Sequence, residues 1–419
     1  MTDAEAGSNE LIALFRAEWP KILATLIRST GSVELAEDAV QEAFARAFVA
    51  RDRALLINPA AWITTVARRI AIDALRRDTN LRKRLPLLLD SSDAPAVPEE
   101  GAAPADDDRL GLLFLVCTPD LASETRLALA LRFVCGVSTE AIAEVLLVEH
   151  SAMSARLTRA KQQIQRAGIR FSTPDDRELD ARLGDVLSTV YLLYTTGYSV
   201  PSASSLHLTL TALELARALR RLRPDDLETA GLLSLLLLTD ARSATRLDAG
   251  GELVTLEDAD RRHWDQSRIQ EGFDLAVIAL PGGGCFALQA GIAGLHAEAP
   301  SWANTDWTMI GVLYDRLEQL WPSPVVSLAR IVARSYGPTG ADRALEELTA
   351  LEPQLTGAVG RQAIAVRADL FRRSGRPGEA RALYQRALQL ERHAPSRDFF
   401  GRRIAELKGP ESGEPDVRP

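Results

Sequence analysis

The stretch SAMSARLTRAKQQIQ, residues 151–165, carries a clear helical pattern. Four apolar residues recur in it at helical spacing: Met153, Leu157, Ala160 and Ile164. This spacing predicts a seam that is buried against a neighbouring helix. The opposite face combines small residues with arginines, and no acidic residue occurs before Asp175. The whole chain, by contrast, carries 57 acidic and 49 basic residues, a net charge of −8.

A second predicted helix comes just before this stretch. The segment STEAIAEVLLV, residues 138–148, begins with Ser138, a residue type that caps helix N-termini. Only about four residues separate the two helices, a spacing typical of a helix-turn-helix. An acid-free helix that bears arginines neutralises DNA phosphates and releases their counterions. A solvated helix face explains the same charges, so both interpretations stay open.

The composition favours an all-α protein of several domains. A length of 419 residues suggests roughly two to four domains, and the abundant Ala, Leu and Arg are strong helix formers. The three cysteines and five histidines show no metal-ligand spacing, so we expect neither a metal nor a cofactor. The N-terminus lacks a signal-peptide pattern, and the longest apolar run, at 231–238, is too short to span a bilayer. We therefore expect a cytoplasmic protein without a membrane partner.

The N-terminal part contains helical patterns followed by an acidic linker. Ser32 and Asn58, the latter followed by proline, mark two helix starts. Residues 64–84 carry seven basic and two acidic residues. Residues 91–108 contain six acidic residues, three prolines and no basic residue, a composition that predicts a flexible linker. Two basic modules joined by a flexible linker suit a protein that holds DNA at two separate places.

A break at 172–176 begins a second helical part. Residues 361–394 fit a tetratricopeptide repeat of 34 residues, and a weaker copy precedes them. Such repeats stack helix pairs into a concave surface that binds proteins or peptides. We predict repeats near 325–394, within an extension that covers 178–407 and is followed by a disordered tail at 408–419.

Three motifs resemble regions 2 and 4 of a bacterial RNA polymerase sigma factor: LAEDAVQEAF at 35–44, NPAAWITTVARRIAIDALRR at 58–77, and the helix-turn-helix at 127–165. Because only the linker separates them, the resemblance is to the extracytoplasmic-function (ECF) class. Four later motifs resemble the ECF subgroup with a C-terminal tetratricopeptide-like extension; they lie at 191–199, 240–265, 305–315 and 323–333. The resemblance implies sigma region 2 at 8–90 and sigma region 4 at 109–172.

The resemblance implies a promoter-recognition subunit rather than an enzyme. Its partners would be promoter DNA and RNA polymerase core, through the β′ clamp helices and the β flap. Contacts to the clamp helices would come from an acidic helix with Glu37, Asp38, Gln41 and Glu42. The −10 element would be approached and melted by Trp62, Thr65, Arg68, Arg69, Arg76 and Arg77. The −35 element would be bound in the major groove by Ser151, Ser154, Ala155, Arg156, Thr158, Arg159 and Lys161. A solvated helix face and, for Trp62, a core position are the alternatives.

The predicted extension carries a charged and aromatic cluster around a Gly-Gly turn: Asp240, Arg242, Arg246, Asp248, Arg261, Trp264 and Asp265. A catalytic site, a buried ion-pair network and a peptide-binding surface all fit this composition. The PGGGC run at 281–285 lacks the following Lys-Ser/Thr of a phosphate loop, so we interpret it as a helix-to-helix connection. The resemblance favours regulation: the extension would gate sigma activity, with a regulatory protein or peptide as a further partner.

Two other functions fit the sequence. A stand-alone helix-turn-helix regulator with a repeat sensor domain would bind DNA without polymerase. A tetratricopeptide scaffold protein would carry its basic helices only as solvated surface. Salt dependence separates the scaffold from the others, because several phosphate contacts cost roughly three decades of affinity between about 50 and 200 mM salt.

Overall fold

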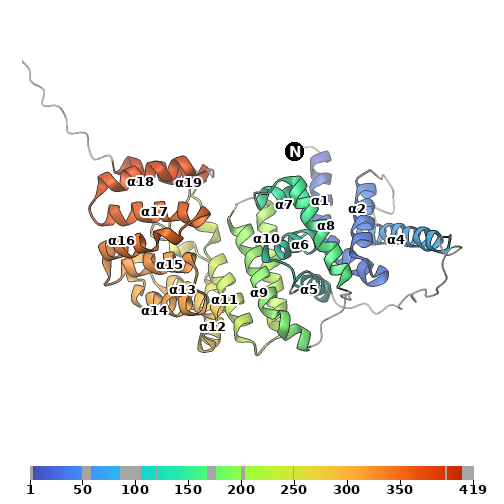
Figure 1. Ribbon diagram of the computed structural model, residues 1–419, viewed down its shortest axis with the longest axis horizontal. Helices are drawn as coiled ribbons and strands as arrows, with labels where there is room; N and C mark the ends of the chain where they lie inside the picture. Colours follow the sequence, from blue (N-terminus) through green and yellow to red (C-terminus); the bar gives the residue numbers. More distant parts are fainter. Residues whose placement is uncertain are drawn as a thin grey trace, which may run out of the picture. The chain divides into compact units, whose positions relative to one another are not determined.

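The computed structural model of the protein describes residues 3–49, 58–84, 105–118, 120–167, 176–199, 203–248, 250–391 and 394–407. In these residues the regular elements are α-helices and short 3-10 helices, together with one isolated bridge between Leu247 and Leu253. The predicted all-α fold class is confirmed. The chain divides into two compact units, Met1–Leu222 and Arg223–Pro419 (Figure 1).

The first unit begins with four helices: α1 (Asp3–Thr30), α2 (Val33–Val49), α4 (Pro59–Arg84) and α5 (Ala105–Val116). The predicted helix starts are confirmed, because the Ser32 hydroxyl accepts a hydrogen bond from the N–H of Leu35 (3.3 Å). The Asn58 side chain likewise accepts from the N–H of Ala61 (3.1 Å). The predicted acidic linker lies outside the described residues up to residue 104, as does the tail at 408–419. The last part of the linker, residues 105–108, is helical instead, at the start of α5, where Asp108 pairs with Arg28 (2.6 Å).

An aromatic cluster joins α1 to α2. The ring centroids of Phe15 and Trp19 lie 5.0 Å apart, and those of Phe15 and Phe44 lie 4.6 Å apart in an edge-on arrangement. Trp19 and Phe44 are buried, and Ile63 on α4 is buried as well. Rings that meet edge to face at this distance add about 0.5–1.5 kcal/mol beyond their burial. This cluster holds α2 in place, so that its outer side chains have a defined direction.

Three further helices follow in the same unit: α6 (Ser123–Phe133), α7 (Thr139–Val145) and α8 (His150–Arg166). Ser138 caps α7 as predicted, since its hydroxyl accepts from the N–H of Ala141 (3.2 Å). The turn to α8 includes Leu147 with a positive φ of 54°. The predicted seam of α8 is confirmed: Met153, Leu157, Ala160 and Ile164 are all buried.

Two helices beyond the break at 172–176 belong to the first unit. They are α9 (Asp176–Ser199) and α10 (Ala203–Leu222), which pack on each other and against α5 and α6. Arg109 on α5 pairs with Glu214 on α10 (2.5 Å). Cys117 donates to the Thr189 hydroxyl of α9 (3.3 Å), and burial raises the pKa of this thiol to about 12. The start of the predicted extension is therefore built into the unit that holds the helix-turn-helix segment.

The second unit is a run of nine helices in the described residues, in which consecutive helices pack on one another from α11 onward (Figure 1). They are α11 (Leu227–Asp240), α12 (Gln266–Ala279), α13 (Cys285–Glu298), α14 (Trp307–Leu320), α15 (Pro324–Tyr336), α16 (Gly340–Leu351), α17 (Gly357–Arg373), α18 (Pro377–Leu390) and α19 (Ala394–Glu406). Helix α11 is buried nearly all round, because α12 and α13 both cover it. A Cβ at Gly231 would lie 2.6 Å from the backbone nitrogen of Ala287, so this glycine permits the close approach of α11 and α13.

The segment in which we predicted a complete repeat forms α17 and α18. Gly375 lies between them with a φ of +72°, a conformation that favours glycine. Four residues of the predicted repeat are buried in one cluster with Phe400 of α19: Ala368, Ala380, Tyr384 and Ala387. The pair thus buries three alanines and one tyrosine of the segment in which the repeat was predicted. No helix in the described part of the chain is long and apolar enough to cross a membrane.

Candidate polymerase and nucleic-acid interface

Helix α8 presents most of the predicted −35 residues to solvent. The exposed ones are Ser151, Ser154, Ala155, Thr158 and Arg159, while Arg156 and Lys161 are half-buried. The small side chains at the start of the helix leave its backbone open to close approach by a partner. Lys161 differs from the others because it turns toward α2, as described below.

Helix α4 presents a basic face made of predicted −10 residues. Thr65, Arg68, Arg69, Arg76 and Arg77 are exposed. The Thr65 hydroxyl donates to the carbonyl of Ala61 (2.8 Å), so it is engaged with the helix backbone. Trp62 is half-buried.

The predicted polymerase-binding residues on the acidic helix α2 fall into two groups, which differ in exposure. Asp38, Gln41 and Glu42 are exposed, and Glu42 pairs with Arg46 on the same helix (2.8 Å). Glu37, by contrast, is only 4% exposed. A buried carboxylate requires partners that compensate for its lost hydration.

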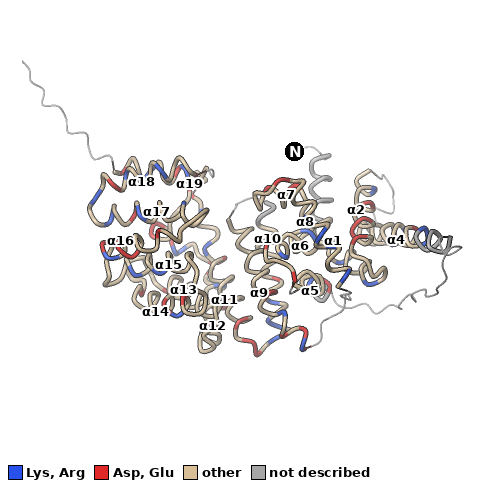
Figure 2. Tube along the Cα trace, in the orientation of Figure 1, with Lys and Arg blue, Asp and Glu red and all other residues tan. Residues whose placement is uncertain are grey.

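Those partners come from α6 and α8, in the predicted helix-turn-helix segment. Figure 2 marks the basic and acidic residues along the chain. The Arg132 Nε on α6 lies 2.6 Å from one Glu37 oxygen, and the Lys161 Nζ on α8 lies 3.0 Å from the other. Gln41 also donates to Glu37 (3.0 Å). Burial raises the pKa of Glu37, but the charges of Arg132 and Lys161 outweigh it, so the pKa lies below its ordinary value. The guanidinium of Arg132 also lies over the Trp19 ring, 5.0 Å from its centroid.

This ion-pair triad lies in a cleft between α2 and α8. A cavity of about 480 Å³ opens there, and its lining includes Gln41 and Phe48 on one side and Ser154 and Thr158 on the other. Residues predicted to contact polymerase therefore face residues predicted to contact DNA. This arrangement was not predicted from the sequence. A signal was present, however, because Glu37 falls at helical spacing within the apolar stripe of Val33, Val40 and Phe44.

The predicted cluster in the second unit is a network of structural contacts. Asp240 pairs with Arg268, and Asp265 caps α12 by accepting from the N–H of Arg268 (3.0 Å). Trp264 is buried and donates to the Thr245 hydroxyl (3.0 Å). These contacts agree with the interpretation of the cluster as an ion-pair network.

Four other residues of this cluster shape the loops around it. Asp248 accepts from the N–H groups of Gly250 (2.8 Å) and Glu252 (2.9 Å), and the carbonyl of Arg246 accepts from the N–H of Val254. Arg261 donates to the carbonyls of the α13 C-terminus at His296 (2.7 Å) and Ala299 (2.5 Å). The Nε of Arg242 is buried and has no hydrogen-bond partner. No group of three or more potential metal-binding side chains occurs in the described residues.

The PGGGC run connects α12 to α13, as predicted. Its helix N-terminus does bind an anion, but the anion is the carboxylate of Glu228 on α11. The N–H groups of Phe286 and Ala287 each donate to this carboxylate at 3.0 Å. The position that a phosphate would take at this helix end is therefore filled by the chain itself.

Comparison with known proteins defines the class of the chain. Residues 14–80, which include α2 and most of α4, match Sigma-70 region 2. Residues 182–280 match a family of unknown function, DUF6596, whose span crosses from the first unit into the second. This region 2, on an all-α scaffold, supports a sigma factor role in transcription initiation, and the Sigma-70 match implies RNA polymerase core as the partner.

Two curated relatives match the chain. Uncharacterized protein R00370 of Rhizobium meliloti (strain 1021) is 38% identical over 400 residues, which cover 93% of each chain. The ECF RNA polymerase sigma factor SigJ of Mycobacterium tuberculosis (strain ATCC 25618 / H37Rv) is 28% identical over 201 residues, 44% of this chain and 62% of SigJ. No solved structure matches the chain significantly.

Proposed function

We propose that the protein is an ECF-type sigma factor that directs core polymerase to specific promoters and is controlled by its own C-terminal extension. The observation that carries this proposal is the placement of the region 2 match. It covers one helix with exposed acidic residues, Asp38 and Glu42, and a second helix with an exposed row of arginines. The first surface suits the β′ clamp helices, and the second suits the −10 strand.

The chemistry of α4 and α8 supports two separate contacts with promoter DNA. The arginines of α4 would hold the phosphates of a separated strand, and Trp62 would stack on an unpaired base. Helix α8 would enter the major groove at the −35 element, where Arg156 and Arg159 are the candidates for base or phosphate contacts. The second contact to polymerase would be the β flap, made by the helix-turn-helix segment at 109–172.

Control by the extension is supported by the ion pairs of Glu37 with Arg132 and Lys161, which hold α2 against α6 and α8. Lys161 cannot reach DNA while its ammonium group is paired with Glu37, and Glu37 cannot reach polymerase while it is buried. The first two helices of the predicted extension, α9 and α10, pack on α5 and α6, so they brace the segment that supplies Arg132. The rest of the predicted extension, with its tetratricopeptide-like repeats near 325–394, would carry the regulatory input.

Binding to core polymerase tests this proposal. The substitution Asp38→Arg should weaken the affinity for core by about tenfold or more, because it places a cation where the clamp helices meet an acidic surface. Glu124→Arg is the matched control, since Glu124 is an exposed carboxylate on α6. If both variants bind core as the wild type does, α2 is not the interface. If the wild type binds promoter duplex but not core, the stand-alone regulator replaces the sigma factor as the explanation.

A further inference from the structure

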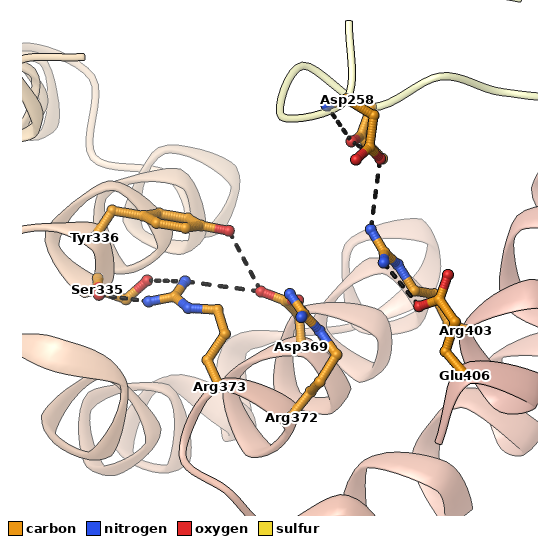
Figure 3. A network of polar contacts seen from close by, with 9 residues as sticks. Asp258, Ser335, Tyr336, Asp369, Arg372, Arg373, Arg403 and Glu406 are labelled. Carbon is orange, nitrogen blue, oxygen red and sulfur yellow. Dashed lines mark hydrogen bonds and ion pairs between the residues drawn. The ribbon is translucent and has the colours of Figure 1, made fainter. Parts of the chain in front are cut away.

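An extended loop of the second unit lies against the helices of the predicted repeats. Residues 250–260 read GGELVTLEDAD, with four acidic side chains and no basic one. The loop has a single bridge, between Leu247 and Leu253, and is otherwise irregular. Figure 3 shows Asp258 on this loop, opposite Arg403 on α19.

Two arginines of α19 hold the loop. Arg402 donates to the backbone carbonyl of Leu253 (2.8 Å) and pairs with Glu252 (3.0 Å). Arg403 pairs with Asp258 (3.7 Å) and, more closely, with Glu406 on its own helix (2.9 Å). The side chains of Arg402 and Glu252 are 44% and 40% exposed. A pair as exposed as Arg402–Glu252 contributes little to stability, so it positions the loop without locking it.

A cavity of about 230 Å³, lined in part by four aromatic side chains, lies beneath the loop. Its lining includes Leu256, Trp302, Tyr336, Val366, Tyr384 and Phe399. Cavities that hold small-molecule ligands run from about 300 to 1,000 Å³, so this one is small for a cofactor. Its size suits one apolar side chain of a bound polypeptide.

The floor of this cavity is held by a polar network on α15 and α17 (Figure 3). The Arg373 guanidinium lies over the Tyr336 ring, 3.7 Å from its centroid, and donates to the hydroxyl (2.9 Å) and carbonyl (2.5 Å) of Ser335. Asp369 accepts from Arg372 (2.7 Å). Because these side chains are already paired, the floor is preformed, and the contacts with an extended segment come from Arg402 and Arg403, which in this structure hold the loop.

We propose that the face formed by α15, α17 and α19 is a binding groove for an extended acidic segment of a partner protein, and that residues 252–258 occupy this groove in cis. The loop shows the chemistry that the groove recognises: a backbone carbonyl bound by arginine, flanked by carboxylates that pair with Arg402 and Arg403. A partner segment with the same charges and one additional apolar side chain would also fill the cavity. This inference goes beyond the proposed function and does not depend on it, since it concerns the second unit alone.

The occupied groove has a consequence for affinity. A tethered segment acts at an effective concentration in the millimolar range. A free peptide therefore meets an open groove in only a fraction of the chains, and its apparent Kd rises in inverse proportion to that fraction. Release of the loop should lower the apparent Kd.

The test uses the full-length chain and a fluorescein-labelled peptide GGELVTLEDAD, with binding followed by anisotropy. The double substitution Glu252→Gln and Asp258→Asn removes the two ion pairs between the loop and α19, which favours release of the loop and leaves the groove's own residues unchanged. We expect this variant to bind the probe about tenfold more tightly than the wild type. Adding Arg402→Ala and Arg403→Ala to it should abolish binding, and so should a probe in which Gln and Asn replace the four acidic residues.

Two results would overturn the proposal. One is a released-loop variant that keeps its circular dichroism spectrum and melting transition but binds the probe no better than the wild type. The other is equal binding of the acidic and the neutral probe, which would show that the arginines do not select for charge. Polymerase is absent from this assay, so its outcome does not depend on whether the sigma factor function holds.

Discussion

Replacement of Lys161 by methionine should open the cleft between α2 and α8. The Lys161 ammonium lies 3.0 Å from the buried Glu37 carboxylate. Removing one partner of a buried ion pair costs about 3–5 kcal/mol, because the remaining charge loses its compensation. Since Arg132 stays in place, we expect the lower end, about 3 kcal/mol. We call the chain closed when Glu37 is paired with α6 and α8, and open when it is not. At about 1.4 kcal/mol for each factor of ten, the ratio of closed to open chains falls roughly 100-fold.

The assay is the affinity of the full-length chain for core polymerase. If closure hides Glu37 from the clamp helices, Lys161→Met should bind core more tightly than the wild type, by up to roughly 100-fold. Arg166→Met removes the same charge from an exposed position of α8 and should leave the affinity unchanged. An affinity of Lys161→Met equal to that of the control, with unchanged circular dichroism, would refute the link between the ion-pair triad and polymerase binding.

Three further predictions concern stability and DNA binding. Gly231→Ala should lower the free energy of unfolding, measured in urea, by about 1–3 kcal/mol, because its Cβ would lie 2.6 Å from the Ala287 nitrogen. Gly184→Ala is the control: a Cβ there meets nothing within 4 Å, so this variant should raise the free energy of unfolding by about 0.5–1 kcal/mol. Burial and two neighbouring arginines lower the pKa of His296 from 6.5 to about 4. The unfolded chain therefore takes up this proton first, and the free energy of unfolding should fall by up to about 3 kcal/mol between pH 6.5 and 4, a loss that His296→Gln should remove. Arg156→Ala should weaken promoter binding by about 1–3 kcal/mol if Arg156 contacts a base, whereas an equal loss on every promoter sequence would show a phosphate contact only.

Local features were predictable from the sequence because they depend on neighbours within one or two turns. Ser32, Asn58 and Ser138 cap helices where their spacing placed them. The apolar seam of α8 follows from periodicity alone. The PGGGC run connects two helices, as its missing Lys-Ser/Thr indicated.

Contacts between distant residues were not predictable in this way. Glu37 lies 95 residues from Arg132 and 124 residues from Lys161, and the sequence does not show which of many basic residues will meet it. The carboxylate of Glu228 at the start of α13 is a similar case, 58 residues from Phe286. The grouping of α9 and α10 with the first unit also rests on long-range packing, and the predicted domain limits remain a prediction.

Run-off transcription with purified core polymerase, on the DNA upstream of the protein's own gene, is the decisive experiment for the sigma factor function. The comparison is between the full-length chain and a chain that ends at Leu222, so that α9 and α10 keep their packing on α5 and α6. We predict initiation at a defined start site by the full-length chain and a changed level of transcript from the shortened chain. A folded full-length chain that binds core but initiates at no promoter, with or without residues 223–419, would contradict the account.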